Sequence, residues 1–590
     1  MSGPQIRFYE FNEFAIDVAN GLLMRDGQPV PLQPKAFELL CLLVEQRGKV
    51  LRKKALMAKL WPDSFVEEAN LSQNIYLLRK VLGSAAGKTE FITTVPKLGY
   101  RFTAEVRDIA EVAADAGAPS ESSAKSDSGD DARMFDSIAI LPLDNSENDA
   151  KTDYLADGLT ESIINNLAQL PRLKVVARSV VFRYKSTTED PRELGRQFNV
   201  RTVMTGKVLQ VDQRIIIQAE LVDVEQGWQL WGARYNRELG DLLTLQEEIS
   251  QEISGQLRLK LTREDRQRIG RGQTENTEAY RLYIKGRYYW NRRLTRPLSE
   301  AITYFERAVA QDPNYALAYV GLADCYALLS LYGALTPAEA FPKSSAAASR
   351  ALSLDEGLSE AHCSMGVVNL FYEWNWAAAE QSFQRSIELK AEYSDAHQRY
   401  GILLTVLGRF DESIEELRLA ALLDPLSLIT GTVAGYPFYY SRRYELAAEQ
   451  FRNTSEMDPN FSLAHFRLGL TYEQKGMYDE ALTELNRSHE ISGDRDVVAA
   501  IGHVNAMRGH RGEAVAALNE LTDLSERQYV SAYNIAILHA GLGDLDQAFE
   551  WLEKACEERS YWMIYAKVDP RLDALRSDPR FQSILLRVGF

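Results

Sequence analysis

Cysteine is scarce in this 590-residue chain, which has only four: Cys41, Cys325, Cys363 and Cys556. They lie far apart and none belongs to a C-x-x-C motif, so neither a disulfide framework nor a thiolate zinc site is expected. The hydrophobic share of 45% and the charged share of 25% are ordinary for a globular protein. The length predicts about four domains. This composition excludes collagen-like and wholly disordered chains. The few, widely spaced cysteines fit a reducing compartment.

Long hydrophobic runs are missing as well. The first residues, MSGPQIRFYEF, contain no basic stretch followed by an apolar one, so they do not form a secretory signal peptide. No segment reaches the roughly 20 apolar residues that a membrane-spanning helix needs. We therefore expect a cytoplasmic protein without a transmembrane helix and without a membrane partner.

Motifs of common catalytic and cofactor sites are also missing. The sequence has no G-x-S-x-G, no H-E-x-x-H and no clear pair of carboxylates. Residues 83–89, GSAAGKT, imitate a P-loop but are one residue too short and follow a predicted helix, whereas a P-loop follows a strand. The seven histidines form no ligand cluster, and His362, His397 and His465 share one packing position of a repeat described below. We expect no catalytic residues, no metal, no cofactor and no enzymatic activity.

Negative charge dominates, with a net charge of −16, but it is unevenly distributed. Residues 1–107 contain 15 Lys and Arg against 11 Asp and Glu, a balance of +4. Residues 108–131 carry −6 and the remainder carries −14, so a basic head precedes an acidic body. Ala, Ser and Asp fill 17 of the 25 positions of residues 108–132. That composition cannot bury a core, which predicts a flexible linker.

The first block, residues 5–104, predicts short strands around three helices. The expected elements are strands at 6–9 and 15–18, helices beginning at Pro34 and spanning 53–60 and 67–82, and strands at 91–95 and 100–102. Asp26-Gly27 is typical of a hairpin turn. Strands, three helices and a terminal hairpin describe a winged helix-turn-helix of the α+β class.

The third predicted helix has two distinct faces. Its core face holds four apolar residues that fall on one side of the helix at 100° per residue, Leu71, Ile75, Leu78 and Leu82. The opposite face holds Ala69, Gln73, Tyr76, Leu77 and Lys80, flanked by Ser72 and Arg79. A glutamine can bond an adenine edge, an exposed leucine can contact a thymine methyl group, and Lys80, Lys53 and Lys54 would neutralise phosphates. The alternative is an ordinary amphipathic helix with a solvated polar face.

The terminal hairpin favours the DNA-binding interpretation. The helix VEEANLSQNIYLLRKVLG and the wing TTVPKLGYRF resemble the C-terminal DNA-binding domain of OmpR/PhoB-type response regulators, and the resemblance covers the whole first block. It implies that the helix enters the major groove and that the wing reaches the minor groove. The family often has Arg where this chain has Tyr76 and Leu77. By position, helix contacts match Ser72, Gln73, Tyr76, Leu77 and Lys80, and wing contacts match Lys97 and Arg101. The predicted DNA-binding residues are therefore Lys53, Lys54, Ser72, Gln73, Tyr76, Leu77, Arg79, Lys80, Lys97 and Arg101.

The second block, residues 133–260, predicts a small α/β domain. It resembles the N-terminal-like domain of TolB and similar domains of bacterial cyclases and regulators, through SIAILPLDN, YLADGLTESIINNLAQLPRLKVVARS, TGKVLQV and LWGARYNREL. The resemblance implies a fold and no chemistry. Asp153, Asp157 and Glu161 stand at i, i+4 and i+8 and imitate a metal-binding stripe. We interpret them instead as acids that suit the dipole of a helix N-terminus.

The third block, residues 275–560, is repetitive. A 34-residue period with Gly or Ala at position 8, Ala at 20, Phe or Leu at 24 and Pro at 32 is typical of tetratricopeptide repeats, and about eight copies are predicted. Gly401, Gly435 and Gly469 follow one another at this period. Each helix pair buries its face only against the next, which predicts an all-α solenoid with a concave surface. Residues 561–590 are expected to form a helical cap.

The predicted fold class is multidomain: a winged helix-turn-helix, a small α/β domain and a tetratricopeptide solenoid. No receiver domain is expected ahead of the winged helix, and the chain is similar to a soluble variant of the family that carries such repeats. We expect a bacterial transcription regulator that binds double-stranded DNA sequence-specifically. Its solenoid would bind a protein or peptide, with RNA polymerase and a second copy of the chain as further candidate partners. The alternative is a cytoplasmic scaffold whose winged helix contacts protein.

Overall fold

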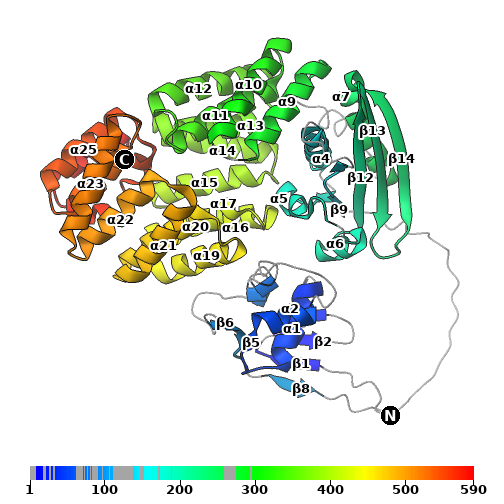
Figure 1. The fold of residues 1–590 in the computed structure, drawn as a ribbon, viewed down its shortest axis with the longest axis horizontal. Helices are drawn as coiled ribbons and strands as arrows, with labels where there is room; N and C mark the ends of the chain where they lie inside the picture. Colours follow the sequence, from blue (N-terminus) through cyan, green and yellow to red (C-terminus); the bar gives the residue numbers. More distant parts are fainter. Residues whose placement is uncertain are drawn as a thin grey trace. The chain divides into compact units, whose positions relative to one another are not determined.

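The N-terminal domain begins with an antiparallel sheet. Its strands, in the order β4-β3-β2-β1-β8, are β1 (Phe8–Phe11), β2 (Phe14–Asp17), β3 (Leu22–Arg25), β4 (Gln28–Val30) and β8 (Arg107–Ile109) (Figure 1). The computed structural model describes residues 8–12, 14–17, 22–25, 28–30, 34–60, 71, 74–75, 78–79, 81–82, 91–95, 98–104, 106–109, 137–145, 152–170, 173–187, 189–257, 274–292 and 295–590. The predicted Asp26-Gly27 turn lies outside these residues, but Arg25 pairs with Gln28 on either side of it, as a two-residue hairpin requires.

Helices and a second sheet complete the N-terminal domain. The helices α1 (Pro34–Glu45) and α2 (Lys53–Leu60) begin at the residues that the sequence predicts. A three-stranded sheet in the order β5-β7-β6 contains β5 (Leu51–Arg52), β6 (Ile92–Val95) and β7 (Gly99–Phe102). Four phenylalanine rings from both sheets pack together in the core, namely Phe11, Phe14, Phe91 and Phe102.

The second domain contains a mixed sheet in the order β11-β9-β12-β13-β14. Its strands are β9 (Ser137–Ile140), β10 (Asp144–Asn145), β11 (Lys174–Val175), β12 (Thr202–Val211), β13 (Arg214–Asp223) and β14 (Gln229–Glu238), and β10 pairs with β12 off the main order. Its helices are α4 (Asp153–Leu167), α5 (Arg178–Val181), η1 (Phe182–Tyr184), α6 (Pro191–Gln197), η2 (Leu239–Asp241) and α7 (Leu242–Gln256). The expected α/β pattern is present, and α5 with η1 are additions that the sequence did not indicate.

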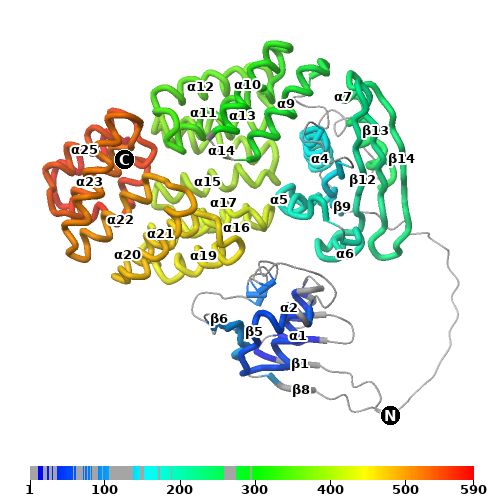
Figure 2. The backbone as a smooth tube through the Cα atoms, viewed as in Figure 1, coloured from blue at the N-terminus to red at the C-terminus, as the bar shows by residue number. Residues whose placement is uncertain are grey.

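The remaining described residues form eight pairs of helices, which Figure 2 traces in succession from α9 onward. The first four pairs are α9 (Thr277–Trp290) with α10 (Thr295–Gln311), α11 (Ala316–Leu331) with α12 (Pro337–Leu354), α13 (Ser359–Val368) with α14 (Trp376–Leu389), and α15 (Ser394–Leu407) with α16 (Phe410–Leu423). The last four pairs are α17 (Leu428–Val433) and α18 (Tyr436–Tyr440) with α19 (Tyr444–Met457), α20 (Ser462–Gln474) with α21 (Tyr478–Ser492), α22 (Arg495–Met507) with α23 (Arg511–Ser525), and α24 (Ala532–Gly541) with α25 (Leu545–Glu557). A π-helical turn, η3 (Asn369–Glu373), extends α13.

The stretch predicted as a C-terminal cap contains three short elements. Two are 3-10 helices, η4 (Tyr561–Tyr565) and η5 (Pro570–Leu575), and the third is α26 (Pro579–Val588). Helix α26 packs on α25 as a cap would. The two 3-10 helices instead pack among the first helices of the last pairs, and most of their side chains are buried.

Close approach between the helices of a pair depends on glycine. A Cβ atom added at Gly401 would lie 2.6 Å from the side chain of Leu417, and at Gly435 it would lie 2.3 Å from the ring of Phe451. These are the residues at positions 8 and 24 of the repeat. Contact with the second helix of the same pair is therefore the reason for the small residue at position 8.

A buried carboxylate joins the second domain to the first repeat. Residues 137–188 and 229–590 lie in one compact unit. Glu161 of α4 is 5% exposed and binds Arg287 of α9 at 2.7 Å and Arg178 at 3.0 Å. Asn291 donates a further hydrogen bond to it at 2.7 Å. Burial alone would raise the pKa of Glu161, but the charges of Arg287 and Arg178 outweigh it and hold the pKa at about 2.

The three acids of α4 are thus bound by cations of the same chain. Asp153 and Asp157 both bind Lys185, at 2.8 and 2.7 Å. The helix-dipole interpretation suits Asp153, which lies in the first turn of α4. It is wrong for Glu161, which lies in the middle of α4 and whose carboxylate binds two arginines. Among the described residues, no group of three or more His, Cys, Asp or Glu side chains is placed to hold a metal ion.

A second contact ties the second domain to the middle of the repeats. Ser179 of α5 donates a hydrogen bond to Asp424, which follows α16. Arg183 of η1 donates to the carbonyl of Leu426 at 3.5 Å. The second domain therefore contacts the solenoid at its first helix and again about four repeats later.

We expect Arg287→Met to lower the free energy of unfolding of this unit by about 3–5 kcal/mol, because Glu161 would stay buried with one of its two cations removed. The matched control is Arg296→Met, since Arg296 is 91% exposed in its contact with Glu300. That change should cost less than about 1 kcal/mol. Urea denaturation followed by circular dichroism measures both values, and equal effects of the two substitutions would contradict the prediction.

Histidine at repeat position 4 joins two helices and a loop. His397 contacts Glu416 of α16 at 2.6 Å through Nδ1 and the Ala391 carbonyl at 2.9 Å through Nε2. His465 contacts Glu484 and the Pro459 carbonyl in the same way. These contacts confirm the packing role that the sequence predicts for His397 and His465.

The raised pKa of His397 predicts that the stability of the solenoid depends on pH. Burial alone would lower its pKa, but the bonds to Glu416 and to the Ala391 carbonyl raise it above the ordinary value. A histidine whose pKa is raised by folding stabilises fully below its unfolded pKa of about 6.5, and the contribution is lost as pH rises through the folded pKa. The melting temperature should therefore fall between pH 6 and 8 more in the wild type than in His397→Gln. Identical pH profiles would contradict this.

Candidate nucleic-acid interface

Of the helix that is predicted to enter the major groove, the structure describes mainly the residues that face the core. Within 71–82 every described residue is helical, and Leu71, Ile75, Leu78 and Leu82 are at most 1% exposed. The core assignment of these four residues is confirmed. Five predicted contact residues lie outside the described residues, namely Ser72, Gln73, Tyr76, Leu77 and Lys80. Their roles stay predictions.

Arg79 of this helix is engaged with the wing. Its guanidinium donates to the carbonyl of Ile92 from Nε at 3.1 Å and from Nη2 at 3.0 Å. Nη2 also donates to Thr94 Oγ1 at 2.7 Å. Because Ile92 and Thr94 lie on β6, Arg79 fixes the helix against the wing. Its predicted contact with DNA stays a prediction, and no pattern in the sequence indicates this positioning role.

The wing itself is a tight hairpin of β6 and β7. Thr93 pairs with Arg101, and Val95 with Gly99. A Cβ atom at Gly99 would lie 1.9 Å from the carbonyl oxygen of Leu51, so only glycine permits β7 to lie against β5. Arg101 is exposed between the buried Tyr100 and Phe102 and therefore points away from the core.

Lysines predicted to contact phosphates lie at the start of α2. The Lys53 amide donates to the Leu98 carbonyl at 3.3 Å, and its Nζ lies 5.9 Å from the centre of the Tyr100 ring. Lys54 is exposed. Lys97, the other predicted wing residue, lies outside the described residues. The start of α2 and the turn end of the wing are therefore adjacent.

Two residues near the wing were missed by the sequence reasoning. Arg52 of β5 is exposed and pairs with Gly99 of β7, which brings its charge beside the wing. Leu98 at the tip of the hairpin is 48% exposed. The alternation of inward and outward side chains in the short strand before α2 could have indicated that Arg52 is exposed. Nothing in the sequence indicates that Leu98 is exposed.

Family comparisons match each of the three blocks. The model "Transcriptional regulatory protein, C terminal" matches residues 27–102. The model "HilA/YgeH-like transcriptional regulator, second domain" matches 134–252, and tetratricopeptide models match 295–336, 433–495 and 530–560. The chain carries an OmpR/PhoB-type winged helix, a HilA-type second domain and tetratricopeptide repeats. The likeness of the second domain to TolB is not confirmed by these matches and stays a prediction.

Three relatives show how far the likeness extends. Transcriptional regulator HilA of Salmonella typhi is 23% identical over 96% of this chain and 98% of its own. A putative adenylate cyclase 3 of Rhizobium meliloti (strain 1021) is 30% identical over 47% of this chain and 41% of the cyclase. Response regulator SaeR of Staphylococcus aureus (strain USA300) is 33% identical over 16% of this chain and 41% of its own. The chain thus spans less than half of the cyclase and of SaeR.

The winged helix is the DNA-binding domain of a transcription regulator, and the repeats are a protein-interaction module. The family models that match the regulator are not those of enzymes. Within the described part of the chain, no helix is both long enough and apolar enough to cross a bilayer.

We expect Arg79→Met to lower the stability of the winged helix by about 1.5–3 kcal/mol, since it removes hydrogen bonds from a charged group. Duplex binding should weaken as well, because the wing loses its attachment to the helix. Arg101→Ala is the matched control: it removes an exposed charge and should weaken binding without lowering stability. Thermal melting and fluorescence anisotropy separate the two effects, and equal melting temperatures for both variants would contradict the positioning role.

Proposed function

We propose that this regulator binds duplex DNA through one continuous surface made by the helix predicted at 67–82, the start of α2 and the wing. The supporting observation is the exposed basic group formed by Arg52, Lys54 and Arg101 around the β5–β7 pair. These cations suit phosphates, and the side of the helix opposite its buried leucines is left for base contacts. The proposal includes all ten residues predicted from the sequence, to which we add Arg52.

The remaining parts of the chain have separate roles in this proposal. Domain boundaries are proposed at 5–104, 133–260, 275–560 and 561–590, with a linker at 108–132. The repeats take up a protein signal or join two copies of the chain, and RNA polymerase is a further proposed partner. No catalytic activity is proposed, since the likeness to the cyclase covers only part of that protein. The protein would act in the bacterial cytoplasm, where its DNA lies.

A salt titration of the full chain tests phosphate contact. Arg101→Ala and Arg52→Ala should each weaken binding to all duplexes and lower the slope of log affinity against log salt by about 1. Arg385→Ala is the matched control, since Arg385 is exposed on α14, far along the chain from the wing. A chain that binds no duplex at about 50 mM salt would support the alternative of a scaffold whose winged helix contacts protein.

Base reading is tested by a different substitution. Gln73→Ala should relax preference at one base pair and leave the salt slope unchanged, because it removes a hydrogen bond to a base and no charge. Selection of binding sites from a random duplex pool measures this preference. An unchanged selection profile would remove Gln73 from the interface.

A further inference from the structure

The inner side of the last repeats is filled by the chain itself. We define the C-terminal segment as Tyr561–Leu575, which contains η4 and η5. Eight of its apolar side chains are at most 8% exposed and share one cluster with the first helices of the last four pairs, namely Trp562, Met563, Ile564, Tyr565, Ala566, Val568, Leu572 and Leu575. Three residues, 558–560, separate the end of α25 from the segment, so the segment enters this site directly from the last repeat.

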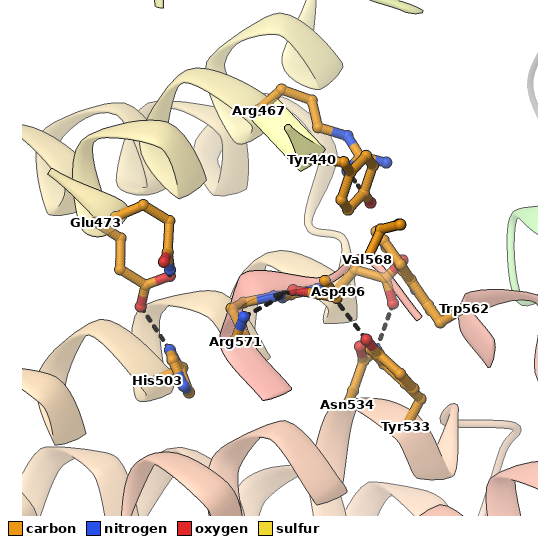
Figure 3. A network of polar contacts seen from close by, with 12 residues as sticks. Tyr440, Arg467, Glu473, Asp496, His503, Tyr533, Asn534, Trp562, Val568 and Arg571 are labelled. Atoms are coloured by element: carbon orange, nitrogen blue, oxygen red, sulfur yellow. Dashed lines mark hydrogen bonds and ion pairs between the residues drawn. The ribbon is translucent and has the colours of Figure 1, made fainter. Parts of the chain in front are cut away.

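Asp496 of α22 is the main polar anchor of the segment. It accepts hydrogen bonds from the Tyr561 hydroxyl and, at 3.0 Å, from Trp562 Nε1. Asn534 of α24 donates to the same carboxylate at 2.5 Å (Figure 3). One carboxylate thus binds two neighbouring aromatic side chains of the segment and joins them to two repeats.

Aromatic and charged groups hold the rest of the segment. The guanidinium of Arg467, on α20, lies 5.1 Å from the Trp562 ring and 4.2 Å from the Tyr436 ring. Asp569 accepts from the Tyr533 hydroxyl of α24 at 2.7 Å and from Arg571 at 2.7 Å. Burial would raise the pKa of Asp569, but Arg571 outweighs burial and lowers it. The segment is therefore bound through an aromatic pair and a carboxylate.

The residues that flank the segment reach back to the third helix pair. Arg559 donates to the Tyr372 carbonyl at 3.3 Å, across 187 residues of sequence. Trp376 Nε1 donates to the Gly589 carbonyl at 2.8 Å, and its ring stacks on Phe590 at 4.9 Å. The C-terminal part of the chain therefore links the last repeat to the third.

The contacts that hold the C-terminal segment differ from those that hold the repeats together. Its 3-10 helices are short and lack the hydrogen-bond ladder of an α-helix. Its polar partners come from α20, α22 and α24, from Arg442 after α18, which binds the Val568 carbonyl and Asp573, and from the Leu407 carbonyl, which accepts from Lys567. The helices α20, α22 and α24 also pack on the second helices of their own pairs. Because repeat arrays are stabilised by such neighbouring pairs, the face can persist without the segment.

We propose that the first helices α18, α20, α22 and α24 form a protein-binding face that the chain's own C-terminal segment occupies, so that a partner binds there only by displacing it. The proposal rests on the function proposed for the repeats. The partner would present the same chemistry, two adjacent aromatic side chains with N–H and O–H donors and a carboxylate several residues later. A tethered segment acts at an effective concentration on the order of millimolar, which excludes weak competitors.

A labelled peptide of residues 559–577 tests the proposal on the full chain. The wild type should not bind this peptide at about 10 μM, because the tethered segment excludes it. Asp569→Ala should release the segment, since Arg571 loses its partner, and should then bind the peptide. Asp496→Ala also releases the segment but should bind the peptide about tenfold or more weakly than Asp569→Ala, because bonds to a charged group are lost.

Controls separate release from unfolding. Leu586→Ala alters a residue that is 73% exposed on α26 and should behave as the wild type. Amide hydrogen exchange should rise in 561–575 of Asp569→Ala while α18–α24 stay protected. Loss of protection throughout α18–α24, no peptide binding by Asp569→Ala, or equal binding by the wild type would each overturn the proposal. Duplex binding by the wild type, measured in parallel, tests the proposed function independently of the peptide result.

Discussion

The solenoid depends on one steric constraint, the close contact between a glycine in the first helix of a pair and a Phe or Leu in the second. At Gly286, Gly366 and Gly435 the added Cβ would lie 2.3–2.5 Å from a phenylalanine ring. Five pairs have this contact, made by Gly286, Gly366, Gly401, Gly435 and Gly469. Close approach within these pairs lets their first helices form a row. The C-terminal segment packs on the last part of this row, so the spacing within the pairs affects what the inner side can hold.

Buried charges then determine how other parts of the chain attach to this row. Glu161 with Arg287 joins the second domain to the first repeat, and Asp569 with Arg571 lies inside the C-terminal segment. Ion pairs of this kind add little net stability compared with apolar contacts, but they are costly to leave half-formed. They therefore specify one arrangement of the joined parts. Most of the second domain lies in one compact unit with the repeats.

In the winged helix, too, a charged side chain holds one element against another. Arg79 connects the helix that is expected to read bases with the strand that leads into the wing. The two elements that we propose to contact DNA are thus held together by one side chain, and Gly99 allows the wing to lie close to β5. Positioning within the head consequently depends on residues that themselves need not contact DNA.

The sequence by itself determined the local elements and the repeats. Leu71, Ile75, Leu78 and Leu82 follow helical periodicity, and the 34-residue spacing of Gly401, Gly435 and Gly469 follows from contacts within one helix pair. Both patterns arise from residues close together in the chain, and the resemblance of the first block to a known family rests on a continuous motif. The partners of Arg79, Glu161 and Asp496 could not be found in this way. Each of these side chains bonds to residues brought near by folding alone, 126 residues away for Glu161 and Arg287 and 66 for Asp496 and Trp562. Only the tertiary structure decided that the inner side of the last repeats is occupied, because no local pattern in Tyr561–Leu575 distinguishes a capping helix from a segment that packs among distant helices.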